Sequence, residues 1–211
     1  MLFRAVRRGW AQARFGANAD RLAPLIGEHV WRLNAARLMP GVIYKTHDVP
    51  GGLARGTRPK VLFTYRKATD VALSIAQKHA LEGPEWFRLH EEHMDASGGY
   101  QAFLRGDTLG LERQIDSWFS VKGLDVLGMH YDGLWSRSAE IESFLGFRAP
   151  LPKRTRPSHA GVPAEDAELI QATYAALDRK IEALPEMFLH RADDTKTVAA
   201  GLGSVPIRLE A

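Results

Sequence analysis

Side chains with reactive or phosphate-seeking chemistry stand at the ends of three β-favouring segments of the sequence. Lys45, Thr46 and His47 end the first segment, Arg66 ends the second and Tyr131 ends the third. In an open parallel sheet, ligands bind outside the carboxyl ends of the strands. We therefore expect these groups to meet at one edge of a sheet. Their convergence is a stronger functional signal than any one of them gives alone.

The segment YRKATDVALS adds a second polar group to the guanidinium. Arg66 leaves the predicted strand, and Ser74 follows eight residues later, about two turns into the next predicted helix. An arginine offers a planar fork of donors and a serine adds a hydroxyl, a combination that suits one phosphate. The alternative is structural: Arg66 pairs with Asp70 at the surface, and Ser74 is simply small enough to pack against the sheet. Spacing alone leaves both interpretations open.

The segments that must position these groups read as strands separated by helices. We predict strands at 42–45, 60–66 and 124–131. The second of them, KVLFTYR, is almost continuously apolar, as strands covered on both faces of a parallel sheet are. Helical patterns fill about 2–14 and 20–38 ahead of the first strand. Strands alternating with helices predict an α/β fold with a parallel sheet flanked by helices.

Two apolar stripes at helical spacing mark helices that cover the sheet. One stripe consists of Leu111, Ile115 and Trp118, and the other of Ile170, Tyr174, Leu177, Ile181 and Leu184. We assign residues 1–191 to a single α/β domain. Residues 192–211 lack periodicity, so we expect them to form a loosely ordered tail.

The first 19 residues are rich in arginine and contain no acidic residue. Such a segment is typical of a targeting presequence or of an arm that binds nucleic acid. Its apolar residues recur at helical spacing: Phe3, Val6, Trp10 and Ala13. This periodicity favours a helix that faces the core. We prefer the helix, expect no nucleic-acid partner, and keep the other two interpretations as alternatives.

The overall composition is that of a soluble globular protein, with 211 residues, a net charge of +3, 45% hydrophobic and 25% charged residues. That length suits one domain with a full core. The sequence contains no run of about 18 apolar residues, so we expect no membrane span. Cysteine is absent, which excludes disulfides, thiolate zinc sites and a cysteine nucleophile. It also fits a reducing compartment, and we expect a cytoplasmic location.

Three stretches together resemble the cytosolic-type sulfotransferases. They are KTHDVP, PKVLFTYRKATDVALS and VLGMHYDGLWSRSAEIESFLGF, which lie in the same order within about 42–147. The family shows a Lys-Thr-His triplet, a strand ending in Arg, a helix start of the type Arg-x-x-x-Asp-Val-x-x-Ser and a later Tyr-Glu-Asp-Leu…Phe-Leu-Gly segment. The resemblance implies a P-loop NTPase-like sulfotransferase fold. It also implies transfer of a sulfuryl group from PAPS (3′-phosphoadenosine 5′-phosphosulfate) to a hydroxyl or amine of a small-molecule acceptor.

The resemblance assigns roles to the residues at the strand ends. His47 matches the family's general base, which takes the proton of the acceptor as its oxygen attacks sulfur. Lys45 matches a lysine that offsets the negative charge developing on the leaving phosphate. Arg66 and Ser74 match the pair that holds the 3′-phosphate of the cofactor, and Tyr131 matches an aromatic residue beside the adenine.

One family element has no counterpart in this sequence. Family members open with a strand and a phosphate-binding loop of the type Pro-Lys-Ser-Gly-Thr-Thr-Trp, whose backbone amides hold the 5′-phosphosulfate. The first residues here, MLFRAVRRGWAQ, resemble instead the helix that follows that loop. We expect the sequence to begin just after this element. The alternative is a chain that has lost the loop, which is then a crippled or non-catalytic relative.

Two further groups of residues are candidates by position. The basic loop at 148–163 lies where the family closes over the 3′-phosphate, so its cations are candidate cofactor ligands, although a solvated loop explains them equally well: Lys153, Arg154 and Arg156. The polar region at 84–106 resembles the acceptor side of the family, and its candidate substrate contacts are Trp86, Phe87, His90 and His93. The two histidines stand three apart on a predicted helix, but without a third ligand a metal site is disfavoured.

Two rival functions stay open at this point. The chain can be a non-catalytic module that binds 3′-phosphoadenosine nucleotides or a protein partner. It can also be another P-loop-like transferase or a kinase. The kinase is disfavoured because the sequence has no Walker loop and no pattern of Mg²⁺-binding carboxylates.

Overall fold

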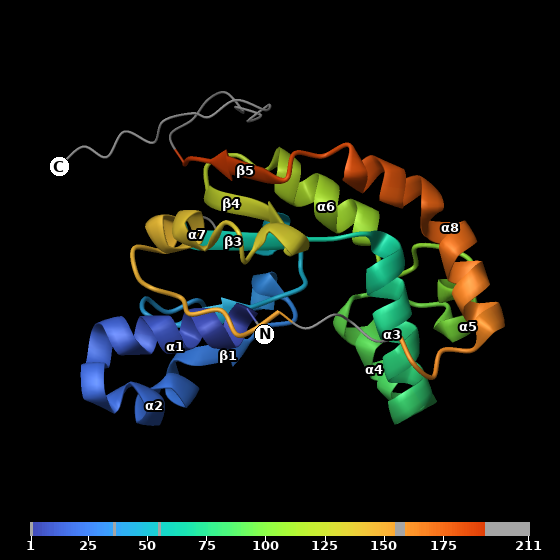
Figure 1. Cartoon of the computed structure of the whole chain (residues 1–211), viewed down its shortest axis with the longest axis horizontal. Helices are drawn as coiled ribbons and strands as arrows, with labels where there is room; N and C mark the ends of the chain where they lie inside the picture. The colour runs from blue at the N-terminus through green and yellow to red at the C-terminus, as the bar shows by residue number, and fades with distance from the viewer. Residues whose placement is uncertain (1, 36, 55, 155–158, 193–211) are drawn as a thin grey trace.

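The fold is α/β, with two small sheets enclosed by helices (Figure 1). The computed structural model describes residues 2–35, 37–54, 56–154 and 159–192. The strands are β1 Gly27–His29, β2 Ile43–Lys45, β3 Lys60–Tyr65, β4 Asp125–His130 and β5 Met187–His190. The helices are α1 Leu2–Phe15, α2 Ala19–Leu22, α3 Ala68–Glu82, α4 Pro84–His93, α5 Gly99–Phe103, α6 Leu111–Ser120, α7 Ser138–Leu145 and α8 Ala164–Glu182.

The strands form a pair, β1-β2, and a separate sheet of order β3-β4-β5. β1 and β2 are parallel, with His29 opposite Lys45. β3 and β4 are also parallel, in a register that runs from Lys60 opposite Asp125 to Tyr65 opposite His130. β5 adds to β4 in the antiparallel direction. Parallel pairing in both sheets confirms the predicted fold class, although the sheet is divided and carries an antiparallel edge strand.

The three predicted strands are all present, each slightly shorter than expected. The prediction of one helix across 20–38 is wrong, because this segment contains α2, a short 3₁₀ turn, β1 and a second 3₁₀ turn at Leu33–Ala35. Pro24 lies inside the expected helix, where it removes a backbone donor and clashes with the preceding turn. The helical pattern therefore breaks there, and residues 27–29 extend along β2 instead.

The predicted first helix is confirmed as α1, and it packs closely on the segment that follows α7. Gly9 faces the carbonyl of Arg148, and a Cβ built at this glycine would lie 2.0 Å from that oxygen. The indole of Trp10 donates to the carbonyl of Gly41 at 2.8 Å. Val6 is buried, whereas Ala13, the last residue of the expected stripe, is exposed. The arginine-rich start of the chain is thus part of the fold.

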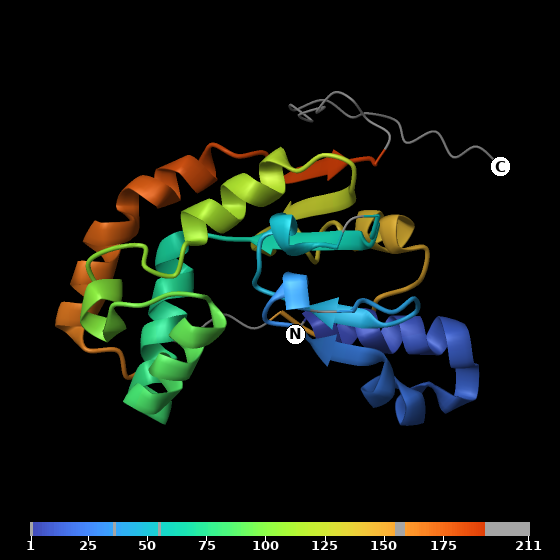
Figure 2. The same ribbon diagram turned by 180° about the vertical axis from the view of Figure 1, so that it is seen from behind.

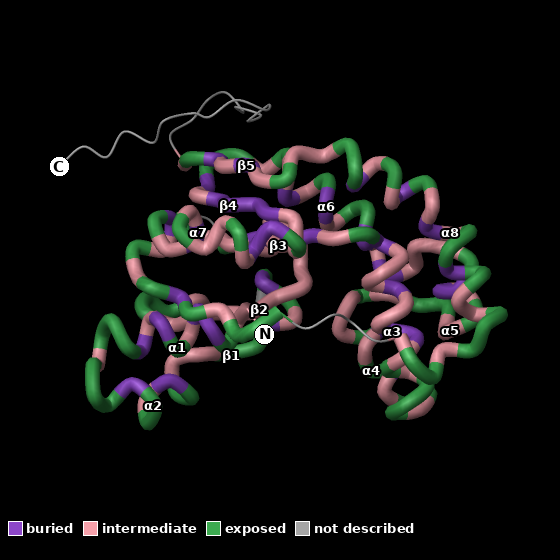
Figure 3. The backbone as a smooth tube through the Cα atoms, in the orientation of Figure 1, coloured by how far each residue is buried: buried purple, intermediate pink, exposed green. Residues whose placement is uncertain are grey.

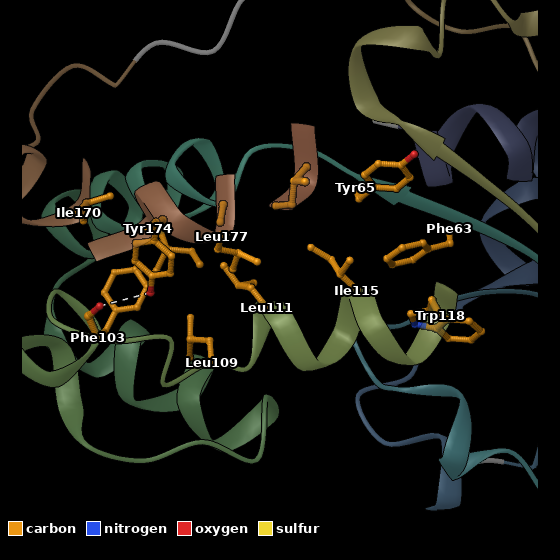
Figure 4. Packing of buried hydrophobic residues seen from close by; sticks show 14 of the residues in the cluster. Phe63, Tyr65, Phe103, Leu109, Leu111, Ile115, Trp118, Ile170, Tyr174 and Leu177 are labelled. Atoms are coloured by element: carbon orange, nitrogen blue, oxygen red, sulfur yellow. Dashed lines mark hydrogen bonds between the residues drawn. The ribbon is translucent and has the colours of Figure 1, made fainter. Parts of the chain in front are cut away.

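The main hydrophobic core joins β3 to the helices α3, α4, α5, α6 and α8 (Figure 4). Both predicted stripes contribute to it, and Leu111, Ile115 and Trp118 are all buried. Tyr174 of α8 is 1% exposed, and its hydroxyl donates to the carbonyl of Phe103 at 3.3 Å. Figure 3 shows the buried residues running through β3 and β4. Among the described residues, no helix is long and apolar enough to cross a membrane.

Gly128 in β4 is expected to tolerate no side chain, which gives a stability prediction. It lies opposite Phe188 of β5, and a Cβ at this position would lie 1.8 Å from the Phe188 ring. We expect Gly128→Ala to lower the free energy of unfolding by about 1–3 kcal/mol, as overpacked core positions do. The matched control is Gly51→Ala, since a Cβ at Gly51 meets nothing within 4 Å. Urea unfolding measures both variants, and equal stability of Gly128→Ala and wild type would contradict this packing.

Candidate functional site

A cavity of about 490 Å³ lies at the carboxyl ends of β2, β3 and β4. It brings together five of the residues singled out from the sequence: Lys45, His47, Arg66, Ser74 and Tyr131. In the view of Figure 2, the arrows of β2 and β3 point the same way, toward the helices α3 and α4 that close the far side. The expected convergence of the strand ends is therefore present in the structure.

The turn after β2 is held by a small network around Asp48. Its carboxylate accepts from the backbone amides of Leu33 and Val49, each at 2.8 Å. The hydroxyl of Thr46 accepts from the amide of Asp48 at 2.9 Å. Thr46 and Asp48 therefore fix the backbone on either side of His47. The imidazole itself is left to face the cavity.

Helix α6 fastens the same turn from the other side. The indole of Trp118 donates to the carbonyl of Asp48 at 3.1 Å. The side-chain amide of Gln114 donates to the carbonyl of His47. Both donors come from the face of α6 that carries the apolar stripe, so packing of that helix in the core also positions the turn. Gln114 was not among the predicted site residues, although it lines the cavity.

Burial and positive neighbours keep the His47 imidazole uncharged. Burial is the larger cause, and Lys45 is the next, so that the pKa of His47 is lowered from 6.5 to about 4. His90 and His29 act in the same direction. The ring also stacks on Trp31, with centroids 6.0 Å apart. At neutral pH the imidazole therefore has a free lone pair that can accept a proton.

A pH titration tests this environment. In the unfolded chain His47 takes up its proton near pH 6.5, but in the folded chain only near pH 4. The unfolded state then binds more protons between these values, so the free energy of unfolding should fall as the pH drops through this range. The contribution is on the order of 3 kcal/mol and is constant below it. NMR of the imidazole carbons measures the folded pKa, and a midpoint at about 6.5 would contradict the buried site.

Arg66 and Ser74 form a hydrogen-bonded pair on the wall of the cavity. Nη2 of Arg66 donates to Oγ of Ser74 at 2.8 Å and to the carbonyl oxygen of Asp70 at 3.0 Å. Oγ of Ser74 in turn donates to the same carbonyl at 2.8 Å. Arg66 thus contacts the backbone of Asp70 and no ion pair between the two side chains forms. The guanidinium is oriented toward the cavity by the first two turns of α3.

Tyr131 follows β4 and lies beside the guanidinium. The Cζ atom of Arg66 is 5.8 Å from the centroid of the Tyr131 ring, within cation–π range. The ring also contacts Trp135, with centroids 5.5 Å apart and an edge-to-face geometry. Tyr131 therefore offers an aromatic face next to a fixed positive charge.

The four candidate substrate residues on α4 divide into two groups. Trp86 and His90 line the cavity and stack on each other, with ring centroids 5.0 Å apart. Phe87 is 2% exposed and packs in the core against Tyr100, outside the cavity lining. His93 also lies outside that lining.

His93 instead stacks on Trp31, with centroids 4.0 Å apart and planes within 6°. Because Trp31 also stacks on His47, this indole links α4 to the turn after β2. Trp31 is not among the predicted site residues, because it falls within the helix predicted across 20–38. The sequence gives little local signal for this strand, because Gly27 and Glu28 of β1 are residue types that are depleted in strands.

Two of the three candidate cations of the 148–163 loop are described by the structure, and neither of them lines the cavity. Arg154 forms an ion pair with Asp132, and its guanidinium lies 5.4 Å from the centroid of the Trp135 ring. Lys153 is exposed, and neither residue lines the cavity. Arg156 is outside the described residues. Arg154 therefore lies beside the end of β4, at Asp132, but it is not part of the cavity lining, and neither is Lys153.

The described residues around the cavity carry positive charge only. Its cations are Lys45, Arg66 and Lys78, and no aspartate or glutamate is among the described residues that line it. The remaining wall is mostly apolar and includes Met94, Leu109 and Ile115. Lys78 was not predicted as a site residue, and its amine also pairs with Glu82. Such a wall suits a ligand with an anionic end and an apolar end.

Comparison of the chain with protein-family models, with curated proteins and with solved structures gave no significant match. The resemblance to sulfotransferases therefore rests on the sequence motifs, and the roles it implies remain predictions.

Proposed function

We propose that the protein is a PAPS-dependent sulfotransferase with a P-loop NTPase-like sulfotransferase fold. The observation that carries the proposal is the cavity at the strand ends. It is lined by the imidazole of His47, the ammonium of Lys45 and the hydrogen-bonded pair of Arg66 and Ser74, and no carboxylate is among its described lining residues. An uncompensated cluster of donors and cations favours a polyanionic ligand. A cytoplasmic location, with its reducing conditions, belongs to the same proposal and is supported by the lack of cysteine.

The size and the donors of the cavity fit a nucleotide of this kind. Its volume of about 490 Å³ lies within the range of about 300–1,000 Å³ typical of small-molecule sites. Within the described chain, the hydrogen bonds of Arg66 come from Nη2, so Nε and Nη1 stay available for the 3′-phosphate. Ser74 adds a hydroxyl beside it, and Tyr131 offers its ring to the adenine.

The chemistry assigned to the remaining residues is a sulfuryl transfer. PAPS supplies the activated sulfuryl group. The acceptor oxygen or nitrogen forms a bond to sulfur while the bond between sulfur and the 5′-phosphate oxygen breaks. His47 accepts the proton of the acceptor, and Lys45 offsets the charge left on the phosphate. An anionic ligand beside His47 raises the pKa of its imidazole and so makes it a stronger base.

The acceptor occupies the apolar part of the cavity in this proposal. Trp86 and His90 present a stacked pair of rings there, next to Met94 and Leu109. Apolar walls with few polar groups hold the body of a small molecule and leave its hydroxyl or amine to be oriented by polar residues. We therefore propose a small-molecule acceptor with an apolar body.

A second candidate function is a non-catalytic module that binds 3′-phosphoadenosine nucleotides. The observation that favours it is the lack of glycine among the described residues that line the cavity. Glycine-rich turns bring backbone amides close to phosphates, and one preorganised donor to a developing anion is worth about 10²–10³ in rate. In such a module the Arg–Ser pair holds the nucleotide but transfer does not follow.

A labelled-donor assay separates the two functions. The purified chain is incubated with PAPS carrying ³⁵S and with a panel of phenols, alcohols and amines. A sulfotransferase is expected to move the label to at least one class of acceptor. Binding of adenosine 3′,5′-bisphosphate without any transfer would contradict the enzyme and support the module.

A further inference from the structure

We propose that the gap between β2 and β3 is a docking site for one extended, apolar peptide strand. β2 is an edge strand of the first sheet and β3 is an edge strand of the second. Each edge therefore offers backbone N–H and C=O groups that no strand pairs in the described chain. Such edges bind an added strand through main-chain hydrogen bonds.

The two edges face a single cavity. This second cavity has a volume of about 640 Å³ and is lined by residues 42–47 around β2 and by residues 59–64 around β3. In Figure 2 the arrows of β2 and β3 point the same way, with the gap between them. A strand that enters there can run parallel to both neighbours. It would turn the two separate sheets into one continuous sheet.

Mostly apolar side chains cover the gap on both faces, although Arg4 of α1 and Gln114 of α6 also line it. On one face lie Leu2, Phe3 and Val6 of α1 with Leu145 of α7, and Figure 1 shows both helices in front of the strands. On the other face lie Leu33, Leu53 and Trp118. Strands buried on both faces of a parallel sheet are nearly continuous apolar runs. The occupant should therefore be rich in Val, Ile and Leu at successive positions.

Because the gap has an unpaired strand edge on each side, an isolated strand fits it better than a strand that already belongs to a sheet. A second copy of this chain would bring an edge strand that is already paired on its far side, so it could satisfy only β2 or only β3. A single extended segment has both of its edges free. Matching the six residues of β3 requires about 20 Å of extended chain.

Docking at this gap places the end of the strand next to the candidate site. Lys45, His47 and Tyr131 line both cavities. A strand parallel to β2 and β3 ends where they end, so its carboxyl end meets these three side chains. The docking proposal stands on the sheet edges and the apolar walls, and it does not depend on which ligand the first cavity binds.

A peptide experiment tests the proposal on the chain as it exists. The probe is an acetylated peptide with six consecutive Val and Ile residues, flanked by Lys and carrying a fluorophore. In a parallel strand, alternate residues pair with opposite neighbours. Two control peptides therefore carry N-methyl groups on either the odd or the even residues, which removes hydrogen bonding to one edge at a time.

The expected result has three parts. The parent peptide binds with a 1:1 stoichiometry in fluorescence anisotropy, and each methylated peptide binds at least ten-fold more weakly. Hydrogen exchange of the β2 and β3 amides slows at least ten-fold on binding.

Four results would overturn the docking site. They are no binding of the parent peptide, full affinity of one methylated peptide, strong protection of both edges in the free monomer, and a dimer in light scattering that protects these edges.

Discussion

His47→Ala is expected to lower the rate of sulfuryl transfer by about 10²–10⁴-fold, the usual contribution of a positioned general base. The imidazole lies in the cavity beside Lys45, and its pKa of about 4 in the free protein keeps it unprotonated at neutral pH. Its backbone is held by Gln114 through the carbonyl oxygen, so removing the ring leaves the turn fastened. The loss should therefore fall on the chemical step and leave nucleotide binding in place.

The assay for this variant measures transfer under single-turnover conditions, together with the affinity for adenosine 3′,5′-bisphosphate. His47→Gln is the matched control for shape, because an amide fills the site but is not a base at neutral pH. Both variants should lose transfer while their nucleotide affinity stays within about three-fold of wild type. A transfer rate that survives either substitution would remove His47 from the mechanism.

Arg66→Ala is expected to weaken binding of adenosine 3′,5′-bisphosphate by about 10–100-fold. A hydrogen bond to a charged group is worth about 1.5–3 kcal/mol, and each 1.4 kcal/mol is ten-fold in affinity. Ser74→Ala removes one neutral hydroxyl and should cost less, about 2–10-fold. The two effects should not add fully, because the side chains are hydrogen-bonded to each other at 2.8 Å.

Arg105→Ala is the matched control for Arg66→Ala. Arg105 is exposed, contacts Gln101 and lies outside the described lining of the cavity. Equilibrium dialysis should give this variant the affinity of wild type. Circular dichroism of each variant shows whether the fold is retained. An equal loss in Arg105→Ala and Arg66→Ala would indicate non-specific attraction in place of a phosphate site.

The sequence predicted the strand ends well because the signals there are local. Each of the three predicted strands is a short apolar run with a polar residue immediately after it, and parallel pairing brings such ends to one edge. The Arg66–Ser74 contact also follows from local geometry, since eight residues after a strand end bring a side chain about two helical turns along one face. These parts depend on backbone periodicity, which a sequence shows directly.

The rest of the site depends on contacts between distant segments. Trp31 stacks on His47 and His93 only because β1 pairs with β2, and β1 is three residues long within a stretch that resembles a helix. Phe87 and Trp86 are neighbours on α4, yet one is in the core and the other lines the cavity. A helix shows its apolar face in the sequence, but the partner of each residue is set by tertiary packing.

The division of the sheet was equally hidden from the sequence. Alternating strands and helices predict parallel pairing, but they do not state that β2 and β3 stay apart. Neither the antiparallel β5 nor the apolar walls of the gap had a local signature. The partner of a charged residue is equally hard to predict from sequence. Arg154 pairs with Asp132 because of the way the loop after α7 folds back.

We propose that the ends of β2, β3 and β4 together form one nucleotide site, with Arg66 and Ser74 on the 3′-phosphate. The decisive experiment is calorimetric titration of the wild-type chain with adenosine 3′,5′-bisphosphate and, separately, with adenosine 5′-monophosphate. We predict a micromolar dissociation constant for the bisphosphate and binding at least ten-fold weaker for the monophosphate. No measurable heat with the bisphosphate, or equal affinity for both nucleotides, would rule out a 3′-phosphate site at Arg66 and Ser74.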